Sequence, residues 1–471
     1  MTALLPNPLE NMSLEQFAHA LRSGALRSED VTIRYLERIK KLDPSLHAFE
    51  FVDAEGAIAS ARAMDSLLAA GTDLGPLMGL PIAIKDVFTI RGFPAPKAGS
   101  NVDISSMRSD TEGPFVQALR KAGCVLLGKT KTVEFCLGIT GVSESRGTPH
   151  NPWDLTQHRI PGGSSSGSAV AVASGMCALA IGSDSGGSVR VPAAFNGIFG
   201  LKTSFGLWPT EGVVALDPRV DTIGLLTRTA ADAQVAFHTI SAQLFGYRYH
   251  ANTNLPCLDR LRLGQPDHHF FDGLSDDVAK SYDKAASKLK QAGCRIDAIQ
   301  IPEASERQHY FPLTMPASLI AALGADFFEA NKQHIDPVIR TRMETGLHSK
   351  AADFLALEAK RQASIQRVKE RFRGFDAWIS PVTTVAAPLL SEFDQPQQAL
   401  TLALGMTQNT QPSNYLEQCA VSIPLKDRSG ALPVGLQLMA SAGNDAEILA
   451  MSCAIEQLLG EADRPDLRAI A

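Results

Sequence analysis

The feature that most constrains the fold is an alternation of helix-like and strand-like segments in the first part of the chain. Amphipathic segments at 54–70 and 112–122 alternate with short apolar runs at 80–88, 124–127 and 177–181. Short apolar runs between turn residues are typical of strands that are buried on both faces. The alternation therefore predicts an α/β fold, in which helices cover both faces of a large mixed sheet.

The rest of the chain is richer in helices. Apolar periodicity and capping residues predict further helices over 13–23, 31–41, 169–174, 276–291, 318–332, 351–372 and 445–459. Strand-like runs at 377–379 and 433–439 are expected to rejoin the first sheet, because an isolated strand pair is only marginally stable. The 471 residues show no internal repeat or low-complexity linker. We therefore expect a single domain, 1–471, that contains a helical and more divergent subregion at about 242–343.

Composition and charge argue against several classes of partner. The chain has 44 Lys and Arg against 50 Asp and Glu, a net charge of −6, and no cluster of basic residues. Neither nucleic acid nor an anionic membrane is therefore an expected partner. The uncharged stretch 160–183 is about half Gly, Ser and Pro, which is too polar for a membrane helix.

The cysteines indicate the redox compartment of the protein, and the histidines bear on whether it binds a metal. Seven Cys without a CxxC pair do not form a disulfide framework and favour a reducing compartment. Residues 1–11 lack the basic start and apolar core of a secretory signal, so a cytoplasmic protein is expected. The eleven His show no spacing typical of metal ligands, and no metal or other cofactor is predicted.

Three short motif matches are interpreted as coincidental. Gly123–Thr130 fits the P-loop pattern, but a helix precedes it and its central residues read as a strand, not as a phosphate-binding loop. Gly163–Gly167 fits GxSxG, yet a poor strand precedes it, unlike a nucleophile elbow. Asp184–Gly187 matches chymotrypsin-like proteases, whose fold is all-β and usually rich in disulfides, and we reject that match.

A lysine and two Gly-Ser loops form a more specific combination. Lys85 ends an apolar run that should be buried, and burial favours the neutral amine, which can act as a base. Pro161–Ser168 and Gly182–Pro192 follow within about 105 residues of Lys85. Two Gly directly before Ser188 would free the backbone to present successive N–H groups to one point, as an oxyanion hole requires. No His is placed by a motif to serve as the base, which favours a Ser-Lys arrangement.

This combination resembles the amidase signature family, and the resemblance covers most of the chain. The resemblance implies a catalytic triad of Lys85, Ser164 and Ser188. Ser188 would be the nucleophile that forms the acyl-enzyme. Ser164, held through a cis peptide bond, would relay the proton, and Lys85 would be the terminal base. The triad is intact, whereas Ser166 and Ser185 stand where the family usually has Gly and Thr.

The resemblance also implies supporting residues around the triad. The oxyanion hole would fall on the backbone N–H groups of Ser185, Gly186, Gly187 and Ser188. Gly138 is assigned to the same substrate-binding set, and Asp184 and Arg190 would form an ion pair that holds the loop. Cys136 lies near this region and is interpreted as a core residue in preference to a reactive thiol.

The implied function is hydrolysis of a small carboxylic amide or a related C–N bond, with water as the second substrate and a homodimer as the assembly. One alternative is a protein like the amidase component of tRNA-dependent amidotransferases, which supplies ammonia to a partner. Another is a non-catalytic interaction protein built on the same scaffold. The sequence does not distinguish a primary amide from an anilide, carbamate, hydrazide or urea derivative.

Overall fold

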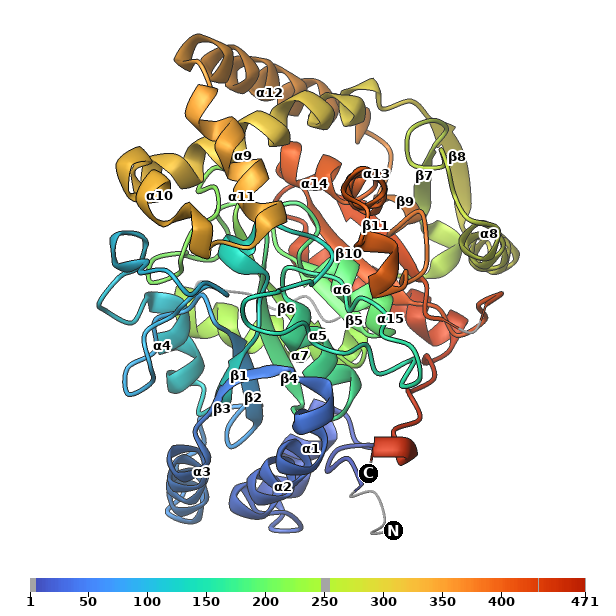
Figure 1. Ribbon diagram of the computed structural model, residues 1–471. Helices are drawn as coiled ribbons and strands as arrows, with labels where there is room; N and C mark the ends of the chain where they lie inside the picture. The colour runs from blue at the N-terminus through green and yellow to red at the C-terminus, as the bar shows by residue number, and fades with distance from the viewer. Residues whose placement is uncertain (1–5, 247–254, 431, 471) are drawn as a thin grey trace.

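The computed structural model describes residues 6–246, 255–430 and 432–470, and its strands build one sheet (Figure 1). The eleven strands in these ranges lie in the order β1-β3-β2-β4-β6-β5-β10-β11-β9-β7-β8. Parallel and antiparallel neighbours both occur, so the sheet is mixed. The strands are β1 (Phe49–Val52), β2 (Pro81–Lys85), β3 (Val125–Thr130), β4 (Leu179–Asp184), β5 (Phe199–Lys202), β6 (Thr222–Thr227), β7 (Arg262–Pro266), β8 (Arg295–Ile299), β9 (Ala377–Pro381), β10 (Cys419–Pro424) and β11 (Gly435–Ala440).

Helices flank this sheet, which agrees with the predicted α/β class. In Figure 1, α1, α2 and α3 lie at one end of the molecule, and α9, α10, α11 and α12 lie at the opposite end. The helices are α1 (Leu14–Arg22), α2 (Ser28–Leu46), α3 (Ala54–Ala69), α4 (Pro114–Lys121), α5 (Ser166–Ala173), α6 (Arg190–Asn196), α7 (Ala230–Phe245), α8 (Asp276–Gln291), α9 (Arg307–Leu323), α10 (Ala325–Asn331), α11 (Pro337–Glu344), α12 (Ala351–Arg371), α13 (Pro396–Thr407), α14 (Gln411–Tyr415) and α15 (Asp445–Leu459).

Several predicted elements are confirmed. Helices α8 and α15 have the predicted bounds, and α12 ends one residue before its predicted end. The strand-like runs at 377–379 and 433–439 correspond to β9 and β11, and both strands belong to the common sheet, as expected.

Two predictions about the region after α7 are wrong in part. The helix expected over 318–332 is divided at Gly324, whose φ of 90° and ψ of 134° are not helical, so α9 ends and α10 begins there. The subregion 242–343 is not wholly helical, because β7 and β8 lie inside it and form an edge of the sheet. Residues 247–254 of that subregion lie outside the described residues.

The segment that matches the P-loop pattern belongs to the central sheet, as the sequence suggested. Gly123 follows α4 with a φ of 76°, and its N–H donates to the Arg120 carbonyl at 2.9 Å. The residues that would form a phosphate-binding loop lead into β3, which is buried along its whole length. A strand in mid-sheet has its N–H groups in the ladder and cannot turn them toward a phosphate.

The middle of the sheet brings two chain segments to one edge. Strand β2 pairs in parallel with β4, with Ile82 opposite Leu179 and Ile84 opposite Ile181. The carboxyl ends of parallel neighbours lie at the same edge of a sheet, where ligands commonly bind in α/β proteins. Lys85, the last residue of β2, and Asp184, the last residue of β4, therefore lie at the same edge of the sheet.

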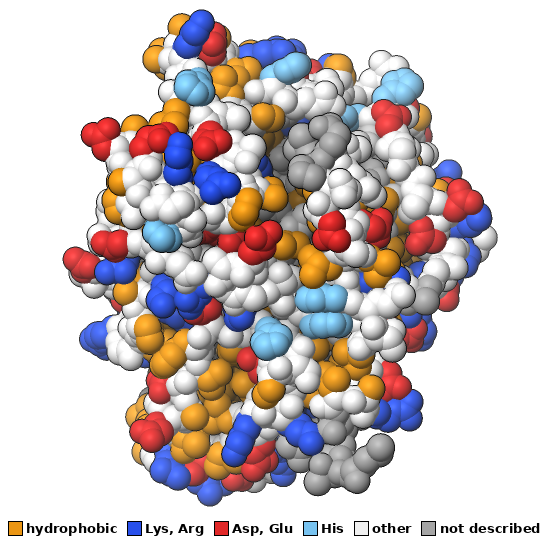
Figure 2. Space-filling view, viewed as in Figure 1, with side chains coloured by type: hydrophobic (Ala, Val, Ile, Leu, Met, Phe, Trp, Pro, Cys, Tyr) orange, Lys and Arg blue, Asp and Glu red, His pale blue; other side chains and the backbone are white. Residues whose placement is uncertain are grey.

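The outer surface carries charges of both signs. Figure 2 shows Lys and Arg mixed with Asp and Glu over the face drawn, without a continuous patch of one sign. Among the described helices, no single one is long and apolar enough to cross a membrane; one pair, 302–323 and 325–334, meets the length and composition criteria together but is bent by 90°.

Candidate active site

Lys85 lies at the centre of the edge where β2 and β4 end. Its side chain is fully buried, and its ammonium nitrogen Nζ lies 2.8 Å from Ser164 Oγ and 2.9 Å from Ser183 Oγ. Burial lowers the pKa of Lys85, while the nearby Cys136 and Asp221 partly oppose that effect. The sequence predicted a buried lysine with a favoured neutral form, and the packing around β2 provides the burial.

Ser164 reaches Lys85 from the Gly-Ser loop that precedes α5. The peptide bond between Gly163 and Ser164 is cis, which agrees with the resemblance to the amidase signature family. This loop is held by its backbone: the Gly163 N–H donates to the Ile139 carbonyl at 2.6 Å, and the Val133 N–H donates to the Ser164 carbonyl at 3.2 Å. Ser164 is fully buried, so its hydroxyl has no access to bulk water.

Ser188 lies beside the same loop, just before α6. The Ser165 N–H donates to the Ser188 carbonyl at 3.1 Å and joins the two Gly-Ser loops. Ser188 is 5% exposed, whereas Lys85 and Ser164 are each 0% exposed. Of the three predicted triad residues, Ser188 is therefore the one that a substrate from solvent can reach.

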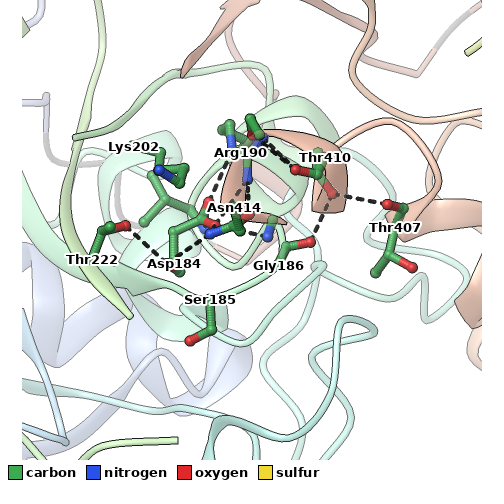
Figure 3. Close-up of polar contacts among 12 residues, drawn as sticks. Asp184, Ser185, Gly186, Arg190, Lys202, Thr222, Thr407, Thr410 and Asn414 are labelled. Atoms are coloured by element: carbon green, nitrogen blue, oxygen red, sulfur yellow. Dashed lines mark hydrogen bonds and ion pairs between the residues drawn. The ribbon is translucent and has the colours of Figure 1, made fainter. Parts of the chain in front are cut away.

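The predicted ion pair between Asp184 and Arg190 is present and holds the loop before Ser188 (Figure 3). Arg190 Nη2 and Nε donate to the two Asp184 carboxylate oxygens at 2.9 and 3.0 Å, and both side chains are fully buried. Burial by itself would raise the pKa of Asp184, but the Arg190 guanidinium outweighs burial and holds that pKa well below its usual value.

Arg190 is tied in turn to helix α14 and its surroundings, which the sequence did not predict. Its guanidinium donates to the Thr410 carbonyl at 2.9 Å and to Asn414 Oδ1 at 2.7 Å. Asn414 Nδ2 also donates to the Asp184 carboxylate at 3.0 Å, and Thr410 Oγ1 donates to the Gly186 carbonyl at 2.8 Å (Figure 3). No local motif marks Thr410 or Asn414, because their partners lie more than 200 residues away in sequence.

The backbone N–H groups of residues 185–188 divide into two sets. This division differs from the expectation that the Gly187 N–H belongs to the oxyanion hole. The Gly187 N–H donates to Asp184 Oδ1 at 2.8 Å, so it supports the loop and is not free to bind a substrate oxygen. In the part of the chain that the structure describes, the N–H groups of Ser185, Gly186 and Ser188 donate no hydrogen bond. Gly187 has a φ of 126°, and a Cβ there would collide with the Thr410 hydroxyl, so this position requires glycine.

Asp221 is a further buried group that the sequence did not reveal. The Ser185 hydroxyl donates to Asp221 Oδ1 at 2.5 Å, and the Leu216 N–H donates to Asp221 Oδ2 at 2.8 Å. Burial raises the pKa of Asp221 to about 7. The Ser185 side chain, which turns away from the ion pair in Figure 3, is thus held by a carboxyl group from the segment before β6.

A small cavity lies beside this carboxyl group. It measures about 20 Å³ and is lined by residues that include Cys136, Ser183, Ser185 and Asp221. That volume accommodates one water molecule. Cys136 is 5% exposed and close to Lys85, so it is a core residue, as favoured from the sequence, that also contributes to the electrostatics of the site.

Gly138 lies in the segment that borders the Ser164 loop. The two residues after Gly138 accept the N–H groups of Gly163 and Gly162 through their carbonyls. A Cβ on Gly138 would lie 2.7 Å from Val133 Cγ1 and 3.7 Å from Ile339 Cδ1 of α11. Helix α11 therefore packs against the segment that carries Gly138. No group of three or more His, Cys, Asp or Glu that could hold a metal ion occurs in the described ranges.

Comparison with known proteins identifies the family. The family model described as Amidase matches residues 30–449. The chain is 33% identical over 452 residues to 2-amino-5-chloromuconic acid deaminase from Comamonas testosteroni, covering 96% of this chain and 97% of that protein. It is 34% identical over 484 residues to a glutamyl-tRNA(Gln) amidotransferase subunit from Acidothermus cellulolyticus, covering 94% of this chain and 93% of that protein.

Solved structures give the same result. A crystal structure described as an amidase superimposes with a TM-score of 0.85 at 29% identity, covering 95% of this chain and all of that one. The match extends over nearly the whole chain, in sequence and in fold, and includes the segments that carry Lys85, Ser164 and Ser188. This chain belongs to the amidase signature family.

Proposed function

We propose that this protein hydrolyses a small carboxylic amide, or a related C–N bond, through an acyl-enzyme on Ser188. The observation that carries the proposal is a buried Lys85 bonded to Ser164 at 2.8 Å, beside the partly accessible Ser188. Serine is a weak nucleophile without a base, and a lysine whose pKa is lowered by burial can serve as one. One relative is named as a deaminase, an enzyme that also breaks a C–N bond.

The first half-reaction forms the ester. Ser188 Oγ attacks the carbonyl carbon, its proton passes to Ser164 Oγ, and the Ser164 proton passes to Lys85 Nζ. The carbonyl oxygen becomes an oxyanion, for which the unused N–H groups of Ser185, Gly186 and Ser188 are the proposed donors. Collapse breaks the C–N bond, and the relayed proton leaves with the ammonia or amine.

The second half-reaction releases the acid. Water attacks the acyl carbon, its proton follows the same relay, and the Ser188 oxygen leaves and is reprotonated. The Asp184–Arg190 pair and the Asp184 bond to the Gly187 N–H are proposed to hold the donor loop rigid through both steps. A preorganised donor set avoids reorganisation when charge develops in the transition state.

We expect activity to rise with pH, because only the neutral amine of Lys85 can accept a proton. Burial lowers the pKa of Lys85 below its usual value, so the neutral fraction grows as pH increases toward the slightly alkaline range. Between about pH 5 and about pH 8.5, kcat/KM should increase at least about tenfold. Equal activity at both ends of that range, with circular dichroism unchanged, would contradict the role of Lys85.

The test of the function is product release from a panel of primary amides, anilides and carbamates. Ammonia and free amine are both measured, with hydroxylamine added as a competing nucleophile. If an acyl-enzyme forms, hydroxylamine should capture part of it and yield the hydroxamate in place of the acid. When acylation is rate-limiting, the rate of amine release should not change. Amine release without any hydroxamate would argue for direct attack by water.

A second candidate function is that of an amidotransferase component, which the 34% identity to a glutamyl-tRNA(Gln) amidotransferase subunit favours. Such a component would perform the same chemistry on glutamine and pass the ammonia to a partner. Purified alone, it should show little turnover on the panel and should release ammonia from glutamine faster when its partner protein is added. Efficient turnover of a small amide by the isolated chain would exclude this candidate. Failure of both assays would favour a non-catalytic interaction protein.

We further propose a cytoplasmic protein whose partners are its small-molecule substrate and water, with a homodimer as the assembly. All seven cysteines are unpaired, and six of them are buried, which supports a reducing compartment. The dimer rests on family resemblance, and light scattering of the purified chain would test it.

A further inference from the structure

We infer that Asp221 is the counter-charge that stabilises the ammonium form of Lys85 while this lysine holds the relayed proton. The inference rests on the proposed amide hydrolysis, in which Lys85 changes from a neutral amine to an ammonium group and back. A buried amine gains no hydration when it becomes charged, so this change is costly unless an anion lies nearby. In this role Asp221 acts through Lys85, as a positioning residue, and does not contact the substrate.

The register of the central sheet brings Asp221 to the edge at which Lys85 lies. Strands β4 and β6 are antiparallel, with Asp184, the last residue of β4, opposite Thr222, the first residue of β6. One further step along this register places Ser185 opposite Asp221. The hydrogen bond from the Ser185 hydroxyl to Asp221 Oδ1, at 2.5 Å, agrees with that placement.

Ser183 connects this pair to the base. Its Oγ accepts a hydrogen bond from Lys85 Nζ at 2.9 Å. Ser183 and Ser185 are two residues apart, as are side chains on one face of a strand, and both line the same cavity as Asp221. Lys85 and Asp221 are thus linked through two short hydroxyl side chains. Burial lowers the pKa of Lys85, and the attraction of Asp221 is one of the effects that oppose this shift.

Two other carboxylates near Lys85 are already neutralised by cations. Asp184 is bound to the Arg190 guanidinium at 2.9 Å. Asp86, the residue that follows Lys85, accepts from Lys129 Nζ, also at 2.9 Å. Neither carboxylate can therefore compensate a new charge on Lys85 without weakening its own ion pair.

Asp221, in contrast, is held by neutral donors. Besides the Ser185 hydroxyl, the N–H groups of Leu216 and Asp217 donate to Asp221 Oδ2 at 2.8 and 3.1 Å. The nearest arginine in sequence, Arg219, is paired with Asp217 at 2.6 Å. Among the described residues that line the cavity beside Asp221 there is no Lys, Arg or His. These hydrogen bonds fix the carboxylate in place and leave its charge available to Lys85.

The charge state of Asp221 fits this role in the pH range where Lys85 becomes neutral. Burial raises the pKa of Asp221 to about 7; the Ser185 hydroxyl opposes this effect, and Asp217 adds to it. Asp221 is therefore ionised above about pH 7, as a counter-charge must be. Other titratable groups that face Lys85 are Cys136 and the paired Asp184.

The experiment measures the pH profiles of kcat and kcat/KM for Asp221→Asn. Without the negative charge, Lys85 loses its proton at a lower pH and is a weaker base. The acid limb of both profiles should therefore move to lower pH by about one unit, while the kcat plateau should fall about 10- to 100-fold. A purely structural role of Asp221 would lower the plateau and leave the limb in place.

Two further variants at the same position keep the test independent of one side chain. Asp221→Ala removes the charge without placing an amide NH₂ against the Leu216 N–H, and it covers the case in which Asp221→Asn does not fold. Asp221→Glu retains the charge, and its acid limb should return to within about 0.3 pH unit of the wild type.

Thr222→Val is the matched control. It changes the neighbouring residue and removes the hydrogen bond from the Thr222 hydroxyl to the Asp184 carbonyl, at 2.8 Å, without changing any charge. Its acid limb should stay at the wild-type position, whatever its plateau. The inference is overturned if the limb stays in place when the charge of Asp221 is removed, if the plateau then equals that of the wild type, or if Thr222→Val moves the limb equally.

Sulfonylation of Ser188 separates this inference from the proposed function. Phenylmethanesulfonyl fluoride forms an O–S bond with Ser188 Oγ and loses fluoride, and the hydroxyl proton passes to the same relay, so no amide turnover is needed. The labelling rate, followed by protein mass against pH, should show the same shift of the acid limb in Asp221→Asn. If that shift occurs but the wild type hydrolyses no amide, only the hydrolase proposal fails. If amides are hydrolysed but neither profile shifts, only the role of Asp221 fails. If Ser188 reacts in neither assay, Lys85 is not a working base and both fail.

Discussion

Replacement of Ser188 by alanine should reduce kcat by about 10⁴-fold or more, which removes turnover on every substrate that the wild type accepts. Of the two serines proposed for the triad, only Ser188 is partly exposed, and it lies next to the N–H groups that donate no hydrogen bond. Ser164 therefore cannot replace it as the nucleophile. The measurement is product release under saturating substrate, with the same protein checked by circular dichroism for an intact fold.

Lys85→Ala and Ser164→Ala should be as severe as Ser188→Ala, because the three groups form one relay in the proposed mechanism. Lys85 Nζ and Ser164 Oγ are 2.8 Å apart, and the proton has no alternative path once either is removed. Effects of residues that act as a unit are not additive, so the double variant Lys85→Ala with Ser188→Ala should be no worse than either single variant.

Ser166→Ala is the control from the same loop. Its hydroxyl makes only a marginal 3.5 Å contact with the Lys131 carbonyl, and we expect its activity to remain within about threefold of the wild type. Turnover that survives in Ser188→Ala would refute the nucleophile assignment, and a loss in Ser166→Ala equal to that in Ser164→Ala would show that the loop, not the relay, is being disrupted.

Arg190→Leu should lower the free energy of unfolding by about 3–5 kcal/mol, the usual cost of breaking a buried ion pair from one side. It leaves the Asp184 carboxylate buried without its guanidinium partner and removes the bonds to the Thr410 carbonyl and Asn414. Urea unfolding followed by circular dichroism measures the change. Arg373→Gln is the control, because Arg373 is 79% exposed beside Glu370, and its loss should change stability by less than about 0.5 kcal/mol.

The same pair predicts how stability depends on pH. In the folded protein the pKa of Asp184 is well below its unfolded value, so its contribution is fully present above about pH 4 and is lost as pH falls toward the folded pKa. In Arg190→Leu, that pKa depression is removed, and the loss of stability between about pH 4 and about pH 2 should be smaller than in the wild type. An equal acid dependence in both proteins would contradict the role of Arg190 in lowering the Asp184 pKa.

Elements with local signals were the ones that the sequence predicted well. Helix α8 carries a strong apolar periodicity, α15 follows an Asn-Asp cap, and both have an acidic first turn; their bounds were predicted correctly. Strands β5, β6 and β10 were missed, because strands buried on both faces show neither alternation nor helical period. Gly324, whose backbone divides α9 from α10, looks in sequence like an ordinary glycine in a helix.

The sequence by itself determined the chemistry that is written in contiguous motifs. A lysine at the end of an apolar strand and serines next to paired glycines can be recognised from neighbouring residues alone. Such motifs show which side chains could react and where the backbone is flexible, because both depend on short-range constraints. Through their resemblance to the amidase signature family, these motifs predicted the triad of Lys85, Ser164 and Ser188 and the pairing of Asp184 with Arg190.

Only the tertiary structure decided which groups surround that chemistry and which donors stay free. The contacts of Asp221 with Ser185, of Asn414 with Asp184 and of Arg342 with Leu137 join residues that lie 36, 230 and 205 positions apart. The commitment of the Gly187 N–H to Asp184 likewise depends on the turn that the packed loop adopts. Such contacts arise when separate segments are brought together by burial of the sheet, and no local pattern of residues encodes them.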